Sequence, residues 1–224
     1  MGVEEILEKV RRGDVSIGEA KKQLEFFMVR DVEDFAKIDV GRHLRKGVPE
    51  IIFAENKSPA ETAKIAEEMV KHTGKAIISR VSEEHLKELK KVNKNLNVEV
   101  YDKARMVVVR RNGVTSPRTG GKAGVLTAGT ADVSVAEEAV VMLREAGCDV
   151  YTAYDVGVAG LHRLFKPLKE MLEKGVDVLV VVAGMEGALP SLVASLVNCP
   201  VIGVPVSAGY GYGCLLYTSD AADE

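Results

Sequence analysis

From residue 123 onward the sequence alternates between short apolar runs and helical segments, and this alternation limits the possible folds more than any other feature. Strand-like runs separated by helices of about ten residues or more are typical of βαβ units, which build a parallel sheet covered on both faces. The strand-like runs span residues 124–129, 149–155, 177–184 and 200–205, and the helical segments span 134–146, 161–174 and 189–197. Such sheets bind ligands in the loops beyond the carboxyl ends of their strands, so we expect a functional site there.

The first half of the chain is less regular but contains clear helix start signals. Ser16 with Glu19, and Ser58 with Glu61, have the spacing of a capping box, in which each side chain binds the other residue's backbone amide. We expect the helix after Ser58 to end at Gly74. The other expected elements are helices at 4–12, 16–27 and 82–92 and strands at 49–54, 75–81, 98–101 and 106–109.

The Pro- and Gly-containing segment 115–122 is the best linker candidate. We therefore expect an N-terminal region of residues 1–116 and a second domain of residues 117–213. The last eleven residues, 214–224, follow a Gly-rich turn abruptly and read like a translated sequencing adapter, so we interpret them as a foreign tail. On this interpretation the authentic protein continues beyond Gly213 and the present copy is truncated.

Composition is that of an ordinary globular protein, with 46% hydrophobic and 28% charged residues among 224. The longest apolar stretch, around Val178 to Met185, is far shorter than the roughly 20 residues that span a bilayer, and the charged N-terminus does not resemble a signal peptide. We therefore expect a cytoplasmic protein with no membrane partner. A net charge of −3 without a basic cluster argues against a nucleic-acid partner. Three widely spaced cysteines indicate neither a disulfide framework nor a structural zinc site.

The loop after the first strand of the regular half contains Gly129, Thr130 and Asp132, and we expect Ser134 to be the N-cap of the following helix. A glycine turn, a hydroxyl group and unpaired N–H groups at a helix start together favour an oxyanion such as phosphate. The spacing fits neither a P-loop nor a G-x-G-x-x-G motif, and a simple capped turn would explain the same residues.

The loop after the second strand contains Asp155, Gly157, Gly160, His162 and Arg163. A histidine here would transfer a proton near neutral pH, and an arginine would bind phosphate or carboxylate. The alternative is that His162 and Arg163 form a solvated pair on the first turn of a helix. Their position beside a strand-end glycine loop favours a functional role.

The third and fourth loops contain further candidates. Glu186 follows an apolar strand and precedes Gly187, a position where burial would suit its carboxyl group to acid–base catalysis. Alternatively, Glu186 interacts with the dipole of the next helix. Ser207, Gly209 and Tyr210 begin a loop of alternating glycine and tyrosine that suits close approach to a flat ring or a nucleotide.

Taken in order, the motifs GTAD-VSVAEEA, DVGVAGLHRL, AGMEGALPSLVASLV and PVIGVPVSAGYG resemble the LarB family of nickel-pincer cofactor biosynthesis. Upstream, Ile38, Asp39, Arg42 and the run 45–50 with Lys57 also resemble the LarB N-terminal region. The resemblance implies an α/β fold, in which a small α/β N-terminal region precedes a domain similar to PurE, the aminoimidazole ribonucleotide (AIR) carboxylase/mutase. That domain would be flavodoxin-like, with a parallel sheet in a three-layer arrangement.

The resemblance also implies a reaction. LarB-type enzymes carboxylate the pyridinium ring of nicotinic acid adenine dinucleotide (NaAD) with CO2 or bicarbonate and release AMP, which yields pyridinium-3,5-biscarboxylic acid mononucleotide. Together with the loop chemistry, it leads us to expect Asp132, His162 and Glu186 as catalytic residues. The expected substrate- or phosphate-binding residues are Gly129, Thr130, Asp155, Gly157, Gly160, Arg163, Gly187, Ser207, Gly209 and Tyr210.

Two positions depart from the PurE pattern. Ala131 stands where PurE commonly has Ser, which removes one hydroxyl contact, and Met185-Glu186-Gly187 replaces the Ala-Ala-His loop of PurE. The second difference favours LarB over PurE. A PurE-type carboxylase/mutase of purine biosynthesis and a non-catalytic nucleotide-binding module remain the alternatives.

The family resemblance further implies a cysteine thiolate that adds to the pyridinium ring, downstream of the glycine–tyrosine loop. Here Cys214 falls in the expected foreign tail, and Cys148 and Cys199 are interpreted as packing residues. We therefore expect this copy to bind nucleotide poorly and to be inactive or nearly so. No metal-ligand cluster is evident, a requirement for Mg2+ stays open, and the family implies a homo-oligomer of eight subunits.

Overall fold

The chain divides into two compact units in the computed structural model, which describes residues 3–24, 28–42, 46–92, 96–116, 118–184 and 187–206. The first unit comprises Met1–Val100 and Arg105–Val114, and the second comprises Tyr101–Ala104 and Thr115–Glu224. Within the described ranges, no helix is long and apolar enough to cross a membrane.

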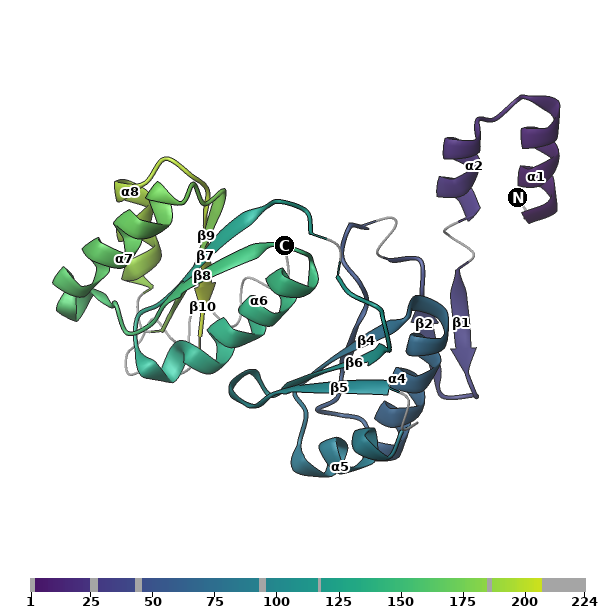
Figure 1. The fold of residues 1–224 in the computed structure, drawn as a ribbon, viewed down its shortest axis with the longest axis horizontal. Helices are drawn as coiled ribbons and strands as arrows, with labels where there is room; N and C mark the ends of the chain where they lie inside the picture. Colours follow the sequence, from purple (N-terminus) through teal and green to yellow (C-terminus); the bar gives the residue numbers. More distant parts are fainter. Residues whose placement is uncertain are drawn as a thin grey trace. The chain divides into compact units, whose positions relative to one another are not determined.

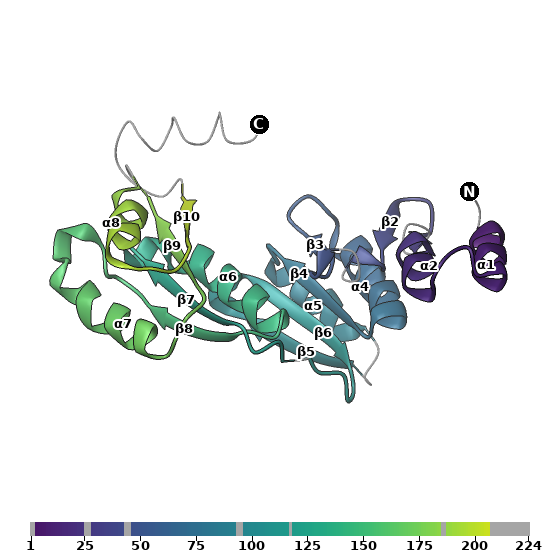
Figure 2. The ribbon, with the colours of Figure 1, turned by 90° about the horizontal axis from the view of Figure 1, so that it is seen from above.

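The first unit contains a four-stranded mixed sheet with the strand order β3-β4-β6-β5. Strands β3 and β4 are parallel, whereas β4 and β6 are antiparallel. The strands are β3 (Ile51–Phe53), β4 (Lys75–Ser79), β5 (Leu96–Tyr101) and β6 (Met106–Arg111), and the main helices are α4 (Pro59–Thr73) and α5 (Glu83–Lys91). The N-terminal elements are helices α1 (Val3–Arg12) and α2 (Ile17–Leu24), which lie side by side, and the hairpin of β1 (Val29–Val32) and β2 (Ala36–Asp39) (Figures 1 and 2).

The expected helix signals of the first unit are confirmed at α4. Ser58 is its N-cap, and Ser58 and Glu61 form the complete capping box. The helix ends at Gly74, which adopts the left-handed conformation with φ of 81°. The hairpin of β1 and β2 was not expected from the sequence, because its short strands are rich in charged residues.

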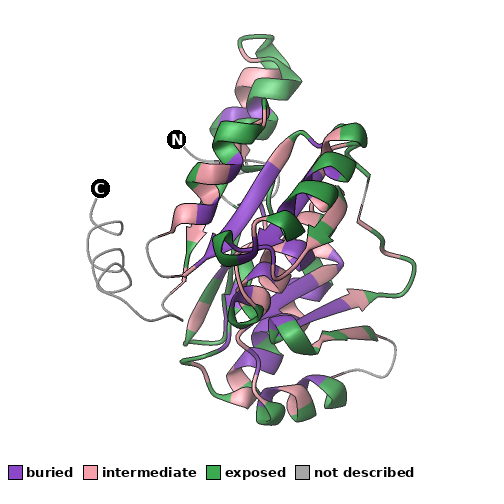
Figure 3. Ribbon diagram, turned by 90° about the vertical axis from the view of Figure 1, so that its left-hand side faces the viewer, coloured by how far each residue is buried: buried purple, intermediate pink, exposed green. Residues whose placement is uncertain are grey.

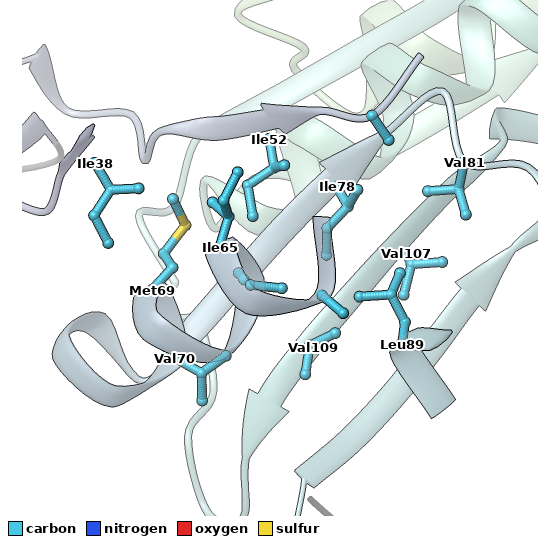
Figure 4. Close-up of a cluster of buried hydrophobic side chains, with 14 of the residues drawn as sticks. Ile38, Ile52, Ile65, Met69, Val70, Ile78, Val81, Leu89, Val107 and Val109 are labelled. Carbon is cyan, nitrogen blue, oxygen red and sulfur yellow. The ribbon is translucent and has the colours of Figure 1, made fainter. Parts of the chain in front are cut away.

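The core of the first unit lies between one face of the sheet and helices α4 and α5 (Figure 4). Val107 and Val109 of β6 face this core, as the two-residue period of a strand requires. The same cluster contains side chains from β2, β3, β4 and both helices: Ile38, Ile52, Ile65, Met69, Val70, Ile78 and Leu89.

His85 connects α5 to the loop before α4. Its side chain is only 6% exposed, its Nδ1 lies 2.7 Å from Ser82 Oγ, and its Nε2 lies 2.9 Å from the Lys57 carbonyl oxygen. A carbonyl oxygen only accepts, so Nε2 carries the hydrogen. This buried side chain therefore joins two helix starts that are distant in sequence.

Replacing His85 with Ala is expected to lower the free energy of unfolding of the first unit by about 2 kcal/mol, because two buried hydrogen bonds and their packing are lost. Chemical denaturation followed by circular dichroism measures this change. The matched control is His72→Ala, because His72 is one-third exposed and pairs with Glu68 on the same helix. Equal effects of the two substitutions would contradict a structural role for His85.

The second unit is a four-stranded sheet in which every strand pair is parallel, with the order β10-β9-β7-β8. The strands are β7 (Lys122–Thr127), β8 (Asp149–Ala153), β9 (Val178–Ala183) and β10 (Val201–Pro205). The helices are α6 (Val133–Glu145), α7 (His162–Glu173) and α8 (Ala188–Leu196). The parallel α/β fold expected from the sequence is thus confirmed, and each of these elements lies within about two residues of its expected bounds.

Helices cover both faces of this sheet (Figures 1 and 3). Val125, Val180 and Val182 pack with α6 on one face. Leu126 and Leu179 pack with α7 and α8 on the other. Because successive side chains of β7 and β9 alternate between two covered faces, these strands are almost continuously apolar. The second unit therefore has three layers, as the resemblance implied.

Candidate functional site

The strand order of the second unit reverses at β7, and this point marks the candidate site. Strand β7 lies between β8 and β9, so the chain leaves β7 toward one side of the sheet and returns later to its other side. In open parallel sheets of this kind, ligands bind where the strand order reverses, beyond the carboxyl ends of the strands. Here that position lies between the loops that follow β7 and β9. The first residue after β7 is held to strand β9 by a hydrogen bond from Ala128 N to Val182 O (2.9 Å).

The loop after β7 encloses the carboxylate of Asp132. This side chain is 4% exposed, and its Oδ2 accepts a hydrogen bond from Gly129 N at 2.8 Å. Burial raises the pKa of the Asp132 carboxyl group above its ordinary value, while the hydrogen bond from Gly129 opposes the shift. A buried carboxyl group with a raised pKa is suited to accept and donate protons.

The structure corrects two expectations about this loop. Ser134 is not the N-cap of α6: the helix begins at Val133, and Ser134 is an exposed residue of its first turn. The Gly129 amide is not unpaired either, because it donates to Asp132. In the 3-10 turn Thr130–Asp132, the Asp132 N–H donates to the Gly129 carbonyl oxygen (3.3 Å), so the Thr130 and Ala131 amides and the exposed Thr130 side chain are the groups that can meet a ligand.

The loop after β8 is bound to the end of β7 by three hydrogen bonds that continue past the strand ladder. Asp155 N donates to Thr127 Oγ1 (3.0 Å), Val156 N donates to Thr127 O (2.9 Å), and Gly157 N donates to Ala128 O (2.9 Å). Gly157 lies so close that a Cβ atom there would be 2.5 Å from the Ala128 carbonyl oxygen. The two loops therefore form one connected surface.

Asp155 and Arg163 form an ion pair within the second loop. Asp155 adopts the left-handed conformation with φ of 58°, and its Oδ2 accepts a hydrogen bond from Arg163 Nη1. Arg163 Nε also donates to the Gly160 carbonyl oxygen at 3.4 Å, and a Cβ atom at Gly160 would collide with the guanidinium group. The Arg163 side chain is still 41% exposed. A cation held on one side and open on the other can bind an anionic group of a ligand.

Of the remaining expected site residues, the structure describes His162 and Gly187. His162 is exposed at the start of α7, and its side chain makes no hydrogen bond to any other residue in the described ranges. Gly187, with φ of 66°, donates to the Gly184 carbonyl oxygen and precedes α8 at the same edge. The other four candidates lie outside the described residues: Glu186, Ser207, Gly209 and Tyr210.

The local field at this edge favours anions. Helices α6, α7 and α8 all begin beyond carboxyl ends of the parallel strands, so their positive dipole ends lie on the same side as the loops. Arg163 adds a full positive charge. Among the residues that the structure describes, no group of three or more His, Cys, Asp and Glu side chains is arranged to hold a metal ion.

Sequence reasoning missed two supporting contacts. Thr127, fully buried as the last residue of β7, holds the Asp155 amide through its hydroxyl group. Tyr154 donates its phenolic hydrogen to Glu137 Oε1 at 3.1 Å, and burial and the Glu137 carboxylate raise the pKa of Tyr154 to about 12. A hydroxyl residue that ends an otherwise apolar strand was the available signal for Thr127. The contact from Tyr154 to Glu137 had no local signal, because Glu137 lies in α6 and Tyr154 follows β8, 17 residues further along the chain.

The fold and the loops together define an α/β protein in which three helix N-termini and Arg163 lie at the edge where the parallel strand order reverses. Residues 29–111 match the LarB/PurE-like N-terminal domain, and residues 122–217 match AIR carboxylase. An uncharacterised protein of Methanocaldococcus jannaschii is 41% identical over 210 residues, which cover 92% of this chain and 82% of that relative. The chain belongs to the LarB family, which joins these two domains.

Shorter similarities connect the C-terminal region to proteins of the AIR carboxylase family. The N5-carboxyaminoimidazole ribonucleotide mutase of Thermotoga maritima is 34% identical over 89 residues, which are 38% of this chain and 50% of that protein. The protein of the same name from Methanocaldococcus jannaschii is 36% identical over 85 residues, which are 38% of this chain and 52% of that protein. The chain therefore spans only about half the length of these mutases.

Proposed function

We propose that this chain is a LarB-type carboxylase that acts on the pyridinium ring of NaAD and supplies a precursor of the nickel-pincer cofactor. The main support is the joining of a LarB/PurE-like N-terminal domain to an AIR carboxylase domain in one chain. The similarity to the archaeal relative extends over both domains, whereas the similarity to the mutases covers 38% of the chain.

The proposed reaction has two parts. A carbon–carbon bond forms between CO2 and a ring carbon, and the proton on that carbon passes to a base. Water then breaks the phosphoanhydride bond, which releases AMP and leaves pyridinium-3,5-biscarboxylic acid mononucleotide. A thiolate that adds to the ring would make the ring carbon electron-rich enough to attack CO2.

The residues at the carboxyl edge of the sheet suit these steps. Arg163 would bind a phosphate group of the substrate, together with the amides of the first loop. Asp132 would accept the ring proton, since its buried carboxyl group has a raised pKa. His162 and Glu186 are the further proton-transfer candidates. We also propose the homo-oligomer that the family resemblance implies.

The direct test is incubation of the archaeal relative with NaAD and carbon-13-labelled bicarbonate, followed by mass spectrometry. The expected products are AMP and a biscarboxylated mononucleotide that carries one heavy carbon. The present chain is the parallel sample, and it is expected to form little or no product. If the archaeal relative leaves NaAD unchanged, the proposal is wrong.

A PurE-type AIR carboxylase/mutase is the second candidate, and the similarity of the C-terminal region to two such mutases favours it. The same assay with aminoimidazole ribonucleotide in place of NaAD distinguishes the two. Incorporation of label into the imidazole nucleotide alone would support the mutase-type function. Nucleotide binding without label in either substrate would instead indicate a non-catalytic binding module.

A further inference from the structure

Thr127 occupies an unusual position for a hydroxyl residue. It is the last residue of β7, it is fully buried, and the rest of that strand is apolar or glycine apart from Lys122 at its beginning. Its Oγ1 accepts a hydrogen bond from Asp155 N at 3.0 Å, 28 residues away in the chain. Valine has the same shape and suits a buried strand better, so the hydroxyl group has a role beyond packing.

The partner of this hydroxyl is a residue in a costly conformation. Asp155 has φ of 58°, the left-handed region that side chains other than glycine rarely adopt. Strand β8 ends at Ala153, so the Asp155 amide has left the hydrogen-bond ladder of the sheet. The Thr127 hydroxyl supplies the acceptor that the ladder no longer provides.

The left-handed turn determines where the Asp155 carboxylate points. From this conformation it accepts a hydrogen bond from Arg163, which lies eight residues further along the chain, on the first turn of α7. The Gly160 carbonyl oxygen holds Arg163 Nε at the same time. A chain of contacts therefore runs from a buried strand residue, through Asp155, to a partly exposed guanidinium group.

We propose that Thr127 is a positioning residue: its hydroxyl group holds Asp155 in the turn that presents Arg163 to an anionic group of the substrate. The identity of that substrate, a nucleotide, rests on the proposed function. Arg163 contacts a phosphate rather than the reacting ring, so loss of the Thr127 hydroxyl changes substrate binding and leaves the chemical step intact.

The test compares Thr127→Val, which removes the acceptor and keeps the shape, with Thr127→Ser, which keeps the acceptor and removes a methyl group. Two quantities are measured on the full chain: hydrogen–deuterium exchange of the Asp155 amide, and the dissociation constant for NaAD by calorimetry. In Thr127→Val we expect faster exchange and binding weaker by about five- to tenfold, the usual value of one hydrogen bond. Thr127→Ser should stay within about twofold of the wild type in both measurements.

Where turnover is measurable, Thr127→Val should raise KM by a factor similar to its effect on the dissociation constant, with kcat unchanged. A purely structural role predicts a different result, in which Thr127→Ser loses as much binding as Thr127→Val. That result, or wild-type exchange of the Asp155 amide in Thr127→Val, would overturn the proposal.

The exchange measurement needs no ligand, so it separates this inference from the proposed function. If the archaeal relative does not bind NaAD, the proposed function fails, and Asp155 exchange in the two variants of the present chain still decides whether the hydroxyl holds the turn. Thermal melts of both variants confirm that each is folded before exchange is compared.

Discussion

Substituting Gly157 with Ala should destabilise the second unit by about 2 kcal/mol or more, because the new Cβ atom has no space and the atoms around it belong to the backbone. The Cβ would lie 2.5 Å from the Ala128 carbonyl oxygen and 3.1 Å from its carbon. Relief requires the loop after β8 to move away from β7, which breaks the hydrogen bond from Gly157 N to Ala128 O. Denaturant unfolding gives the loss of stability, and NaAD calorimetry should show lost binding in the same variant.

The control for this substitution is Gly18→Ala on helix α2. A Cβ atom at Gly18 would meet only Ser16 Oγ, at 4.0 Å, and alanine is the better helix former. We expect Gly18→Ala to keep or slightly raise stability. If Gly157→Ala melts like the wild type and binds NaAD normally, the close contact between the two loops is not required for the site.

Asp132→Asn should have opposite effects on activity and stability. Turnover is expected to fall by about tenfold or more, because the amide cannot accept a proton in the proposed reaction. The amide oxygen can still accept the hydrogen bond from Gly129, so the loop is expected to keep its conformation. Steady-state kinetics on the carboxylation assay measures the first effect, and thermal melts measure the second.

The pH dependence of the stability difference follows from the direction of the Asp132 pKa shift. Burial raises the pKa of Asp132 in the folded state, so folding favours the protonated carboxyl group. This contribution to stability is fully present below the unfolded-state pKa and is lost as the pH rises through the folded-state pKa. Asp132→Asn should therefore melt above the wild type at neutral pH, and the gap should shrink as the pH falls toward about 4, the ordinary pKa of aspartate.

Asp149→Asn provides the matched control, because Asp149 is an exposed carboxylate at the start of β8 in the same unit. It should change neither turnover nor the pH dependence of stability beyond the small effect of a surface charge. A melting temperature for Asp132→Asn that lies below the wild type at neutral pH would contradict the assignment of Asp132 as a carboxyl group whose ionisation is opposed by burial.

Local patterns accounted for most of the fold. The run of apolar residues in β9 predicted a strand buried on both faces, and the capping box at Ser58 with Gly74 predicted the bounds of α4, because these signals act within a few residues. The hairpin of β1 and β2 escaped prediction, since each strand has four residues and only Val32 and Ile38 among them are buried. Such a short strand is defined by its hydrogen bonds to the neighbouring strand and not by a pattern of apolar residues in its own sequence.

The position of the candidate loops was predictable, but their contacts were not. Parallel strands bring their carboxyl ends to one edge, so the sequence alone placed the loops that contain Gly129, Asp155 and Arg163 at that edge. It did not indicate that Gly129 donates to Asp132, and it wrongly assigned the N-cap to Ser134. The hydrogen bond and the start of the helix both depend on the conformation of the turn Thr130–Asp132, which the residue types in the loop do not fix.

The sequence by itself determined the βαβ order and which loops lie at the carboxyl edge of the parallel sheet, because periodicity and turn residues act over short distances. Only the tertiary structure decided that Thr127 meets Asp155, that Gly157 lies against Ala128, and that Asp132 is buried. The first two contacts join residues almost 30 positions apart, and the burial of Asp132 depends on how its loop packs. Strand register and loop conformation create such contacts, and the local sequence pattern determines neither of them.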